Sequence, residues 1–266
     1  MNYLTFSESS HPPTIYYLCP VSYQHDTIVP FKDSTKSKKE QVAEMFDKIA
    51  FRYDFLNHFL SAGIDVSWRR KTINELRSLQ PQNLLDVATG TGDMAIMAQK
   101  MLKPQKIIGI DISEGMLEIG NEKIKKLGLN EVIELVKGDS ETIIFDTNSF
   151  DGVTVAFGVR NFEHLEQGLT EILRVLKPGG RLVVLECSKP KLPLIKQFYK
   201  FYLNTVAPGI GRMISKEKNA YQYLNDSVQK FPEGKNFVDI LNKLGYKNAS
   251  CKTLSLGIAS IYCGEK

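Results

Sequence analysis

The stretch Asn83-Leu-Leu-Asp86-Val-Ala-Thr-Gly90-Thr91-Gly92-Asp93 decides the fold that we expect for this chain. Apolar residues run into an acid, and a turn of small residues follows at once. About 20 residues further on, a second apolar run, Lys106-Ile-Ile-Gly-Ile-Asp111, again ends in an acid. This order is typical of a strand, a tight glycine turn, a helix and a second strand, which together form a nucleotide-type cofactor site.

The residues of the turn indicate which ligand it suits. Gly90 and Gly92 would let the backbone approach a ligand, although glycines also serve in a plain turn. The full G-x-G-x-x-G pattern of dinucleotide sites is missing, and acids stand at Asp86 and Asp93. We expect these carboxylates to repel a pyrophosphate and to favour a ligand with an amine, a sulfonium and a free ribose. S-adenosylmethionine is such a ligand.

The alternation of apolar and amphipathic segments predicts an α/β fold. Segments rich in Val, Ile and Leu with helical crossovers indicate a Rossmann-like, doubly wound domain with helices on both faces of a mostly parallel, seven-stranded sheet. Strands are expected at 83–88, 106–110, 132–137, 151–156, 181–187, 247–253 and 256–263. Helices are expected at 38–61, 68–79, 93–102, 113–127, 163–176, 192–204, 219–229 and 234–244. Lys177-Pro-Gly-Gly180 is expected to form a turn.

The chain divides into three expected parts. Residues 1–36 contain scattered prolines and no apolar period, which predicts a disordered tail. Residues 37–80 carry apolar residues at three- and four-residue steps, so we interpret them as a helical lid. Residues 81–266 would form the main domain. Within it, the segment 190–233 is too long for a simple connection and is expected to build part of a substrate pocket.

Composition narrows the class of protein. A chain of 266 residues with 42% hydrophobic and 24% charged residues fits one medium globular domain. The net charge of +4 is too small to indicate a nucleic-acid partner. The sequence contains no apolar run of about 18 residues, so we expect no membrane-spanning helix. The cysteines and histidines lack metal-ligand spacing, so we expect no metal and reduced thiols in the cytoplasm. A homodimer is left open.

Acids at the ends of the first expected strands are candidates for cofactor binding. Open parallel sheets bind ligands at the carboxyl ends of their strands, and Asp86, Asp111 and Asp139 fall there. Asp111 is expected to accept the ribose hydroxyls, although it would also suit the start of the next helix. Asp139 is expected to accept the adenine amino group, with the Ser140 amide on a ring nitrogen. The alternative for these two is a polar loop.

The residues after the fourth expected strand are candidates for the acceptor side. Phe157-Gly-Val-Arg160-Asn161 leaves that strand at its carboxyl end, where an acceptor would meet the cofactor. Arg160 beside Asn161 is suited to stabilise a developing oxyanion. The alternative is that Arg160 pairs with a surface acid. An aromatic helical segment carries polar residues that would face a pocket: Tyr53, Asp54, Asn57 and His58.

These motifs together resemble a known family. The Asp86 turn, Asp111 and Lys177-Pro-Gly-Gly180 are similar to class I S-adenosylmethionine-dependent methyltransferases. The flanking motifs resemble the signatures of the quinone-biosynthesis C-methyltransferases: Tyr53-Asp-Phe-Leu-Asn57 with Ser61, Gly63 and Trp68, and Arg174-Val-Leu-Lys-Pro-Gly-Gly180 running on to Leu185-Glu-Cys-Ser-Lys-Pro190. The chain departs from the family at Leu56, Asp65 and Cys187, where Met, His and an aromatic residue are usual. The resemblance covers about residues 38–266.

The resemblance implies a reaction and site residues. It implies methyl transfer from S-adenosylmethionine to a ring carbon of demethylmenaquinol, the last step of menaquinone biosynthesis, or in some members to a ubiquinone precursor. The cofactor residues that it carries over are Thr91, Asp111, Asp139 and Ser140. Arg160 with Asn161 would hold the quinol oxygen as an oxyanion. Tyr53 and His58 are weaker candidates for contact or proton removal.

A lipophilic quinol partner implies contact with a membrane surface. We expect a cytoplasmic protein that reaches the inner face of the membrane through the first helix or the segment 192–214, with ordinary packing of both as the equal alternative. Three rival functions remain: a nicotinamide dehydrogenase, a non-catalytic module that uses the fold as a scaffold, and a methyltransferase acting on another small molecule.

Overall fold

The computed structural model describes residues 23–61, 63–190, 197 and 218–266. Its centre is a seven-stranded sheet with the order β3-β2-β1-β4-β5-β7-β6. The strands are β1 (Asn83–Val87), β2 (Lys106–Asp111), β3 (Ile133–Lys137), β4 (Phe150–Ala156), β5 (Leu176–Cys187), β6 (Lys247–Leu254) and β7 (Ala259–Glu265). The α/β class, the strand number and the doubly wound order predicted from the sequence are confirmed.

The strand order reverses next to β1, and the expected ligand-binding edge of the sheet lies there. Strands β3, β2, β1, β4 and β5 are parallel, whereas β7 runs antiparallel between β5 and β6. The chain passes outward from β1 through β2 to β3 and then returns to β4 on the other side of β1. The carboxyl ends of β1, β2 and β4 therefore meet at one edge, the position at which doubly wound sheets bind ligands.

Helices cover both faces of the sheet. On one face, α5 (Leu165–Val175) and α9 (Lys235–Lys243) pack against inward-facing residues of β1, β4, β5 and β7. On the other, α2 (Ile64–Asn74), α3 (Asp93–Leu102) and α4 (Glu114–Lys126) enclose the second half of the core. Alternate strand residues go to opposite faces, so that Leu182 and Val184 join one core and Val183 and Leu185 the other.

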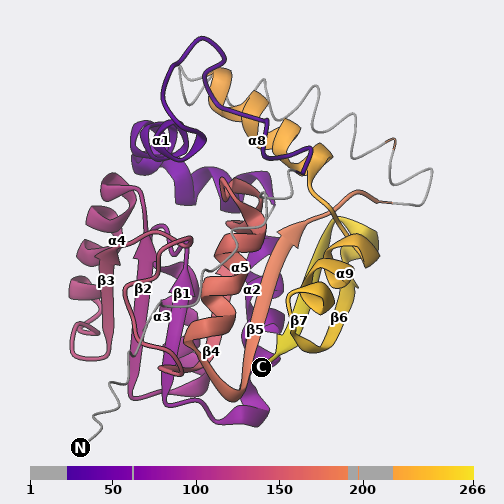
Figure 1. The fold of residues 1–266 in the computed structure, drawn as a ribbon. Helices are drawn as coiled ribbons and strands as arrows, with labels where there is room; N and C mark the ends of the chain where they lie inside the picture. Colours follow the sequence, from indigo (N-terminus) through magenta and orange to yellow (C-terminus); the bar gives the residue numbers. More distant parts are fainter. Residues whose placement is uncertain (1–22, 62, 191–196, 198–217) are drawn as a thin grey trace, which may run out of the picture.

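A third apolar layer lies across the carboxyl end of the sheet. Figure 1 shows α1 (Lys38–Leu60) and α8 (Lys218–Lys230) at this end, above the strands. Val42, Met45 and Ile49 of α1 recur at helical spacing and pack with Tyr223 of α8 and Met116 of α4. The expected first helix at 38–61 therefore forms, and its apolar stripe roofs the ligand edge.

Three charged residues of α1 bind the loops that follow β3, β2 and β1. The Lys39 ammonium pairs with Asp139 and Glu141, which follow β3. Eight residues later, Asp47 Oδ1 accepts the Ser113 hydroxyl at 2.6 Å. Seven residues beyond that, Asp54 accepts the Thr91 hydroxyl at 2.5 Å. Steps of seven and eight residues are about two helical turns, so the three side chains leave the same face of α1.

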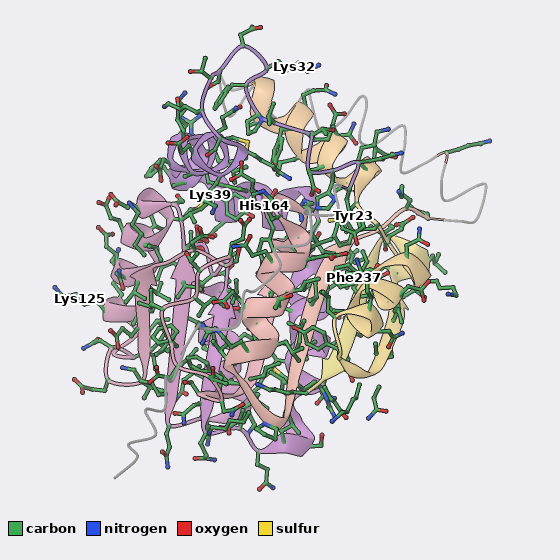
Figure 2. All side chains as sticks on the ribbon, viewed as in Figure 1. Tyr23, Lys32, Lys39, Lys125, His164 and Phe237 are labelled. Carbon is green, nitrogen blue, oxygen red and sulfur yellow. The ribbon has the colours of Figure 1, made fainter. Side chains whose placement is uncertain are left out.

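The N-terminal segment differs from its prediction where the structure describes it. Within the tail expected at 1–36, residues 23–36 are folded against the domain, and residues 1–22 lie outside the described part. His25 is fully buried, and the Tyr23 hydroxyl donates to Glu166 at the start of α5 (Figure 2). Buried Lys38 donates to the carbonyl of His25 at 2.9 Å. These contacts of Tyr23 and His25 hold the segment against the domain despite its prolines.

Smaller differences concern the ends of elements. The helix expected at 68–79 begins earlier, as α2, and its last part is the separate 3-10 turn Arg77–Leu79. Lys177-Pro-Gly-Gly180 lies inside β5 as a bulge, because Phe150 pairs with Leu176 and Gly152 next pairs with Arg181. Most of the expected pocket segment 190–233, including the helix at 192–204, lies outside the described residues, and its described end is α8.

None of the helices in the described ranges is long and apolar enough to cross a membrane.

Candidate active site

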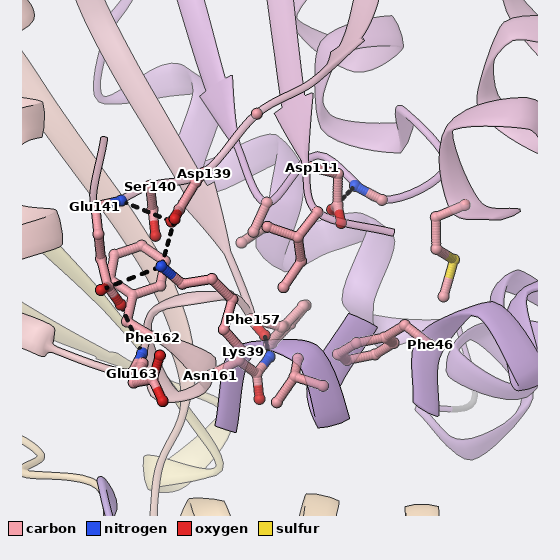
Figure 3. A pocket seen from close by; sticks show the side chains of 18 of the residues that line it. Lys39, Phe46, Asp111, Asp139, Ser140, Glu141, Phe157, Asn161, Phe162 and Glu163 are labelled. Carbon is pink, nitrogen blue, oxygen red and sulfur yellow. Dashed lines mark hydrogen bonds and ion pairs between the residues drawn. The ribbon is translucent and has the colours of Figure 1, made fainter. Parts of the chain in front are cut away.

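A pocket of about 640 Å³ opens at the carboxyl ends of β1, β2, β3 and β4, under α1. Six of the predicted site residues line it, and Figure 3 labels four of them: Asp111, Asp139, Ser140 and Asn161. The residues that line it are Lys39, Val42, Phe46, Tyr53, Ala88, Gly90, Asp111, Ile112, Met116, Gly138, Asp139, Ser140, Glu141, Ala156, Phe157, Gly158, Asn161, Phe162 and Glu163.

Asp111 is the acid that the β2 strand presents to the pocket. Its Oδ2 accepts the N–H of Gly90 at 2.7 Å, and its Oδ1 accepts the N–H of Ser113 at 2.9 Å. Burial raises the pKa of Asp111, and these two N–H groups oppose that shift. Each carboxylate oxygen retains a second lone pair, so the side chain is held in place and can still accept from a ligand. The expected helix cap is instead Ser113, whose hydroxyl accepts from Met116.

The glycine turn after β1 brings backbone to the pocket. Gly90 adopts φ +56°, a left-handed conformation that glycine takes without strain, and it lines the pocket. Gly92 adopts φ +79° as the residue before α3 but does not face the pocket. A side chain at Gly92 would crowd Leu135, at 3.3 Å. Of the two predicted glycines, Gly90 approaches the ligand and Gly92 shapes the turn.

Asp139 and Ser140 line the pocket on its β3 side, as the sequence predicts. Asp139 Oδ1 accepts the N–H of Glu141 at 2.9 Å, and its other oxygen pairs with the Lys39 ammonium. Figure 3 shows Lys39 reaching from α1 across the pocket to both acids. Burial lowers the pKa of Lys39, but the two acids more than offset this effect, so the pKa is raised. Ion pairs therefore hold the first turn of α1 against the loop that follows β3.

Asp86 does not line the pocket, so the structure adds no support for its predicted role in cofactor binding, which stays a prediction. It is 2% exposed and is absent from the pocket wall. Its carboxylate accepts the hydroxyls of Thr89 and Thr154, both at 2.6 Å. Burial raises the pKa of Asp86 to about 6, against the opposing effect of these hydroxyls. Asp86 thus ties the glycine turn to β4 from below.

Thr91 and Asp93 also face away from the pocket. Thr91 is 3% exposed, and its hydroxyl donates to Asp54 of α1. Lys123 of α4 pairs with Asp54 at 2.8 Å and with Asp93 at 2.5 Å. In this structure the Thr91 hydroxyl contacts α1, and its expected cofactor contact stays a prediction. The two carboxylates of the turn do not line the pocket, because Asp93 pairs with Lys123 and Asp86 is buried.

Arg160 is buried beside the pocket rather than on its wall. Its Nη1 pairs with Glu186 Oε2 at 2.6 Å, and Glu186 is fully buried at the end of β5. Burial opposes the charge of Arg160, but Glu186 more than offsets it, so the pKa of the guanidinium is raised. The alternative in which Arg160 pairs with an acid is the one realised. That acid is buried and not on the surface.

Asn161 and Tyr53 form the pocket wall next to this ion pair. Asn161 Nδ2 donates to the carbonyl of Phe157 at 3.3 Å, and its Oδ1 accepts the Tyr223 hydroxyl of α8 at 3.1 Å. The ring of Tyr53 packs edge-on against Phe46, with centroids 5.6 Å apart. Tyr53 also contributes to raising the pKa of Arg160, which places the two groups near each other. The side chain of His58 lies outside the described residues.

An acidic group at the pocket rim is explained by protein contacts. Ligand atoms of Glu141, Glu163 and His164 lie within 4.8 Å of one another. Glu141 Oε1 accepts the N–H groups of Glu163 and His164, both at 2.8 Å, and its Oε2 contacts His164 Nδ1 at 2.9 Å. Glu163 in turn accepts the N–H of Lys38. Among the described residues, these hydrogen bonds link the segment after η2 (Val159–Asn161) to the start of α5 and to α1.

Several site residues were missed from the sequence. They are Lys39, which enters the pocket, Lys123, which pairs with Asp54 of α1, Glu186, which holds Arg160, and Tyr223, which holds Asn161. Asp54 is expected from the sequence only as a polar residue that would face a pocket, and its contacts with Thr91 and Lys123 are not. The partners of the others are 26 to 100 residues away along the chain, so local patterns carry no trace of them.

The comparisons with known proteins agree with this geometry. The model of the ubiE/COQ5 methyltransferase family matches residues 34–266. The chain is 46% identical over 246 residues to a demethylmenaquinone methyltransferase of Bacteroides fragilis, covering 92% of this chain and 100% of that protein. It is 46% identical over 230 residues to the ubiquinone/menaquinone biosynthesis C-methyltransferase UbiE of Geotalea daltonii, covering 86% of this chain and 97% of that protein.

A solved structure supports the fold independently. A SAM-dependent methyltransferase of Thermotoga maritima superimposes with a TM-score of 0.58 at 19% identity, covering 84% of this chain and 99% of that one. At this identity the likeness concerns the fold alone. The family match spans the lid, the sheet and both sides of the pocket. The chain therefore belongs to the ubiE/COQ5 methyltransferase family and is an S-adenosylmethionine-dependent methyltransferase.

Proposed function

We propose that this protein methylates a ring carbon of demethylmenaquinol to give menaquinol, with S-adenosylmethionine as the donor. The observation that carries the proposal is the meeting of two kinds of groups at one cavity. Acids suited to a nucleoside lie on the β2 and β3 side, and Asn161 and Tyr53, backed by buried Arg160, lie on the β4 side. A ubiquinone-precursor benzoquinol is the second candidate acceptor, because relatives are named for both quinones.

The pocket residues fit the donor. Asp111 offers carboxylate lone pairs to ribose hydroxyls, and Asp139 with Ser140 lies where an adenine edge would be read. Val42, Phe46 and Met116 supply an apolar wall for a ring and a thioether. When bound, the donor supplies a methyl group on a positively charged sulfur. In this structure the Lys39 ammonium pairs with Asp139. We expect this ion pair to break when the donor binds, so that the Asp139 carboxylate can accept from the donor.

The acceptor side suits a hydroxylated aromatic ring. An aromatic carbon becomes nucleophilic when a neighbouring hydroxyl loses its proton, so the reduced quinol is the competent form. The charge of Arg160 stabilises such an oxyanion, and Asn161, fixed by Tyr223, can donate its Nδ2 to the same oxygen. As the new carbon–carbon bond forms, the bond between sulfur and the methyl group breaks; the methylated ring carbon then loses its hydrogen as a proton, which restores the aromatic ring, and the quinol oxygen regains one. Tyr53 lines the pocket nearby and is our candidate for receiving or relaying a proton in this sequence.

Water exclusion is the role we assign to the lid. α1 covers the pocket with apolar residues and is tied at Lys39, Asp47 and Asp54 to loops after β3, β2 and β1. Phe157 and Phe162 close the opposite wall. Exclusion of water strengthens the effect of Arg160 on an oxyanion and holds the reacting atoms in line.

The acceptor carries an isoprenoid chain, so we propose that the protein meets it at a membrane surface. α1 exposes Phe51, which is 89% accessible, next to exposed Arg52. An apolar side chain beside a cation suits the boundary of an anionic lipid layer. Flotation with phosphatidylglycerol-containing liposomes should recover the wild type more than Phe51→Ser. Equal recovery would count against this part of the surface.

The direct test is methyl transfer in a purified system. Labelled S-adenosylmethionine is incubated with short-chain demethylmenaquinol, with the oxidised quinone, and with a ubiquinone-precursor benzoquinol. We expect label in the naphthoquinol product, none with the oxidised form, and less with the benzoquinol. Calorimetry with S-adenosylhomocysteine reports donor binding separately. Donor binding without transfer to either quinol would refute the acceptor that we propose.

The cellular test is the quinone profile of cells that lack this protein. Mass spectrometry should find demethylmenaquinone in place of menaquinone, and expression of the wild type should restore the methylated form. An unchanged profile would show that another protein performs this step and would contradict the proposal.

A further inference from the structure

Glu186 is a fully buried carboxylate at the carboxyl end of β5, beside the acceptor side of the pocket. Its Oε2 accepts from Arg160 Nη1 at 2.6 Å and from the N–H of Cys187 at 3.1 Å. Its Oε1 lies 3.4 Å from the backbone N of Arg160. Glu186 therefore holds both the side chain and the main chain of Arg160. A carboxylate with no access to water needs this degree of pairing.

One donor of the Arg160 side chain has no protein partner among the described residues. This donor is Nε, which is buried. The fork of a guanidinium has a fixed shape, so fixing Nη1 against Glu186 also fixes the direction of Nε. Neighbouring Asn161 is fixed separately by the Tyr223 hydroxyl of α8. The two donors after β4 are thus aligned by groups that reach them from β5 and α8.

We propose that Glu186 is a positioning residue for methyl transfer, which orients Arg160 and balances its buried charge. This inference rests on the proposed function, because it assigns Arg160 to the quinol oxyanion. Two separate effects follow. The hydrogen bonds of Glu186 set the direction of Arg160, and its negative charge raises the pKa of any hydroxyl that must ionise next to the pair.

Two substitutions separate these effects. Glu186→Asp retains the charge but shortens the side chain, so turnover should fall at least tenfold while the acid limb of the kcat profile stays at its wild-type pH. Glu186→Gln retains length and one acceptor but removes the charge, so turnover should also fall. Its acid limb should in addition move to lower pH by roughly one unit, because a net positive charge then favours the ionised hydroxyl.

The matched control lies at the opposite end of β5 from Glu186. Glu265 of β7 pairs with Arg181 of β5 at 2.6 Å, so Glu265→Gln makes the same chemical change to another arginine–glutamate pair. We expect it to leave kcat and its pH profile unchanged. Unchanged kcat and pH profile in Glu186→Gln, or equal changes in both variants, would overturn the proposal.

A second readout does not depend on turnover. In protein labelled with ¹⁵N-arginine, the Nε–H of Arg160, identified by its loss in Arg160→Lys, should exchange slowly with water in the wild type. Exchange should be at least tenfold faster in Glu186→Gln and unchanged in Glu265→Gln. If the wild type shows this behaviour but transfers no methyl group, the proposed function fails while the positioning of Arg160 stands. Fast exchange in the wild type would overturn the inference itself.

Discussion

The two sides of the pocket handle charge in different ways. On the β2 and β3 side, Asp111 and Asp139 face the cavity and are held by backbone N–H groups and by Lys39, which is itself about a third exposed. On the β4 and β5 side, Arg160 and Glu186 are buried and satisfy each other. The first arrangement leaves lone pairs and exchangeable partners for a ligand. The second keeps one charge in a fixed place.

The difference indicates a division of labour between the two sides. A site that must bind and release a nucleoside needs polar groups whose present partners can be replaced. A site that must stabilise charge only during reaction needs a preorganised group that water does not reach. Asp86 stands at the boundary, since it accepts from Thr89 of the glycine turn and from Thr154 of β4. The following variants test the comparison, from the largest expected effect to the smallest.

Arg160→Gln should lower turnover by roughly 10²- to 10³-fold, as removal of one oxyanion donor does elsewhere, while the Kd for S-adenosylhomocysteine stays within about threefold. Steady-state kinetics and calorimetry measure the two quantities. Arg181→Gln, which alters the pair at the far end of β5, serves as the control. Equal losses of turnover and donor affinity would contradict the proposal that Arg160 acts in the reaction and not in donor binding.

Asp86→Asn should change how stability depends on pH. Burial raises the pKa of Asp86 from 3.8 to about 6, so the folded state binds the proton more tightly than the unfolded chain. Wild-type stability should therefore fall by up to about 3 kcal/mol, relative to the variant, as pH rises from about 4 to about 6, and the difference should then stay constant. Urea unfolding at several pH values measures it. Parallel curves would show that Asp86 titrates normally.

Asp111→Asn should raise the Kd for S-adenosylhomocysteine by roughly 10- to 100-fold, because hydrogen bonds to a charged group are worth about 1.5–3 kcal/mol. Turnover at saturating donor should change much less. Asp151→Asn is the control, since Asp151 accepts the N–H of Gln82 and Asn83 at the opposite end of the sheet. An unchanged Kd in Asp111→Asn would remove this residue from the donor site.

Lys39→Met should tighten donor binding a few-fold, because Asp139 would no longer have to leave its partly exposed ion pair. Lys36→Met removes a lysine that pairs with Glu44 outside the pocket, and it should have no effect. Calorimetry decides between two roles for Lys39. Weaker binding in Lys39→Met would mean that this lysine contacts the donor instead of competing with it.

Much of the fold could be predicted from local patterns. The seven strands and most helices lie within a few residues of their expected bounds, because alternating Val, Ile and Leu runs report burial directly. The predictions failed mainly where a contact with a distant residue decided the outcome. The segment 23–36 packs because Tyr23 meets Glu166 and His25 meets Lys38. No local pattern contains those partners.

The strand ends show where prediction of the site stopped. Asp86 and Asp111 look alike in sequence, since each follows an apolar run and precedes a polar loop. In the sheet, Asp86 pairs with Gly109, so it lies two residues deeper than Asp111 on the neighbouring strand. That offset, about 6.6 Å, buries one carboxylate and leaves the other at the pocket.

By itself, the sequence determined the order of strands and helices, the edge at which a ligand binds, and the family to which the chain belongs. Only the tertiary structure decided which charges meet. Because of the strand register, Asp86 lies beneath the site. Glu186 pairs with Arg160 at the end of β5, and Lys39 of α1 pairs with Asp139. Local patterns report whether a residue is buried. The partner of a buried charge depends on how separate elements pack, which no single segment encodes.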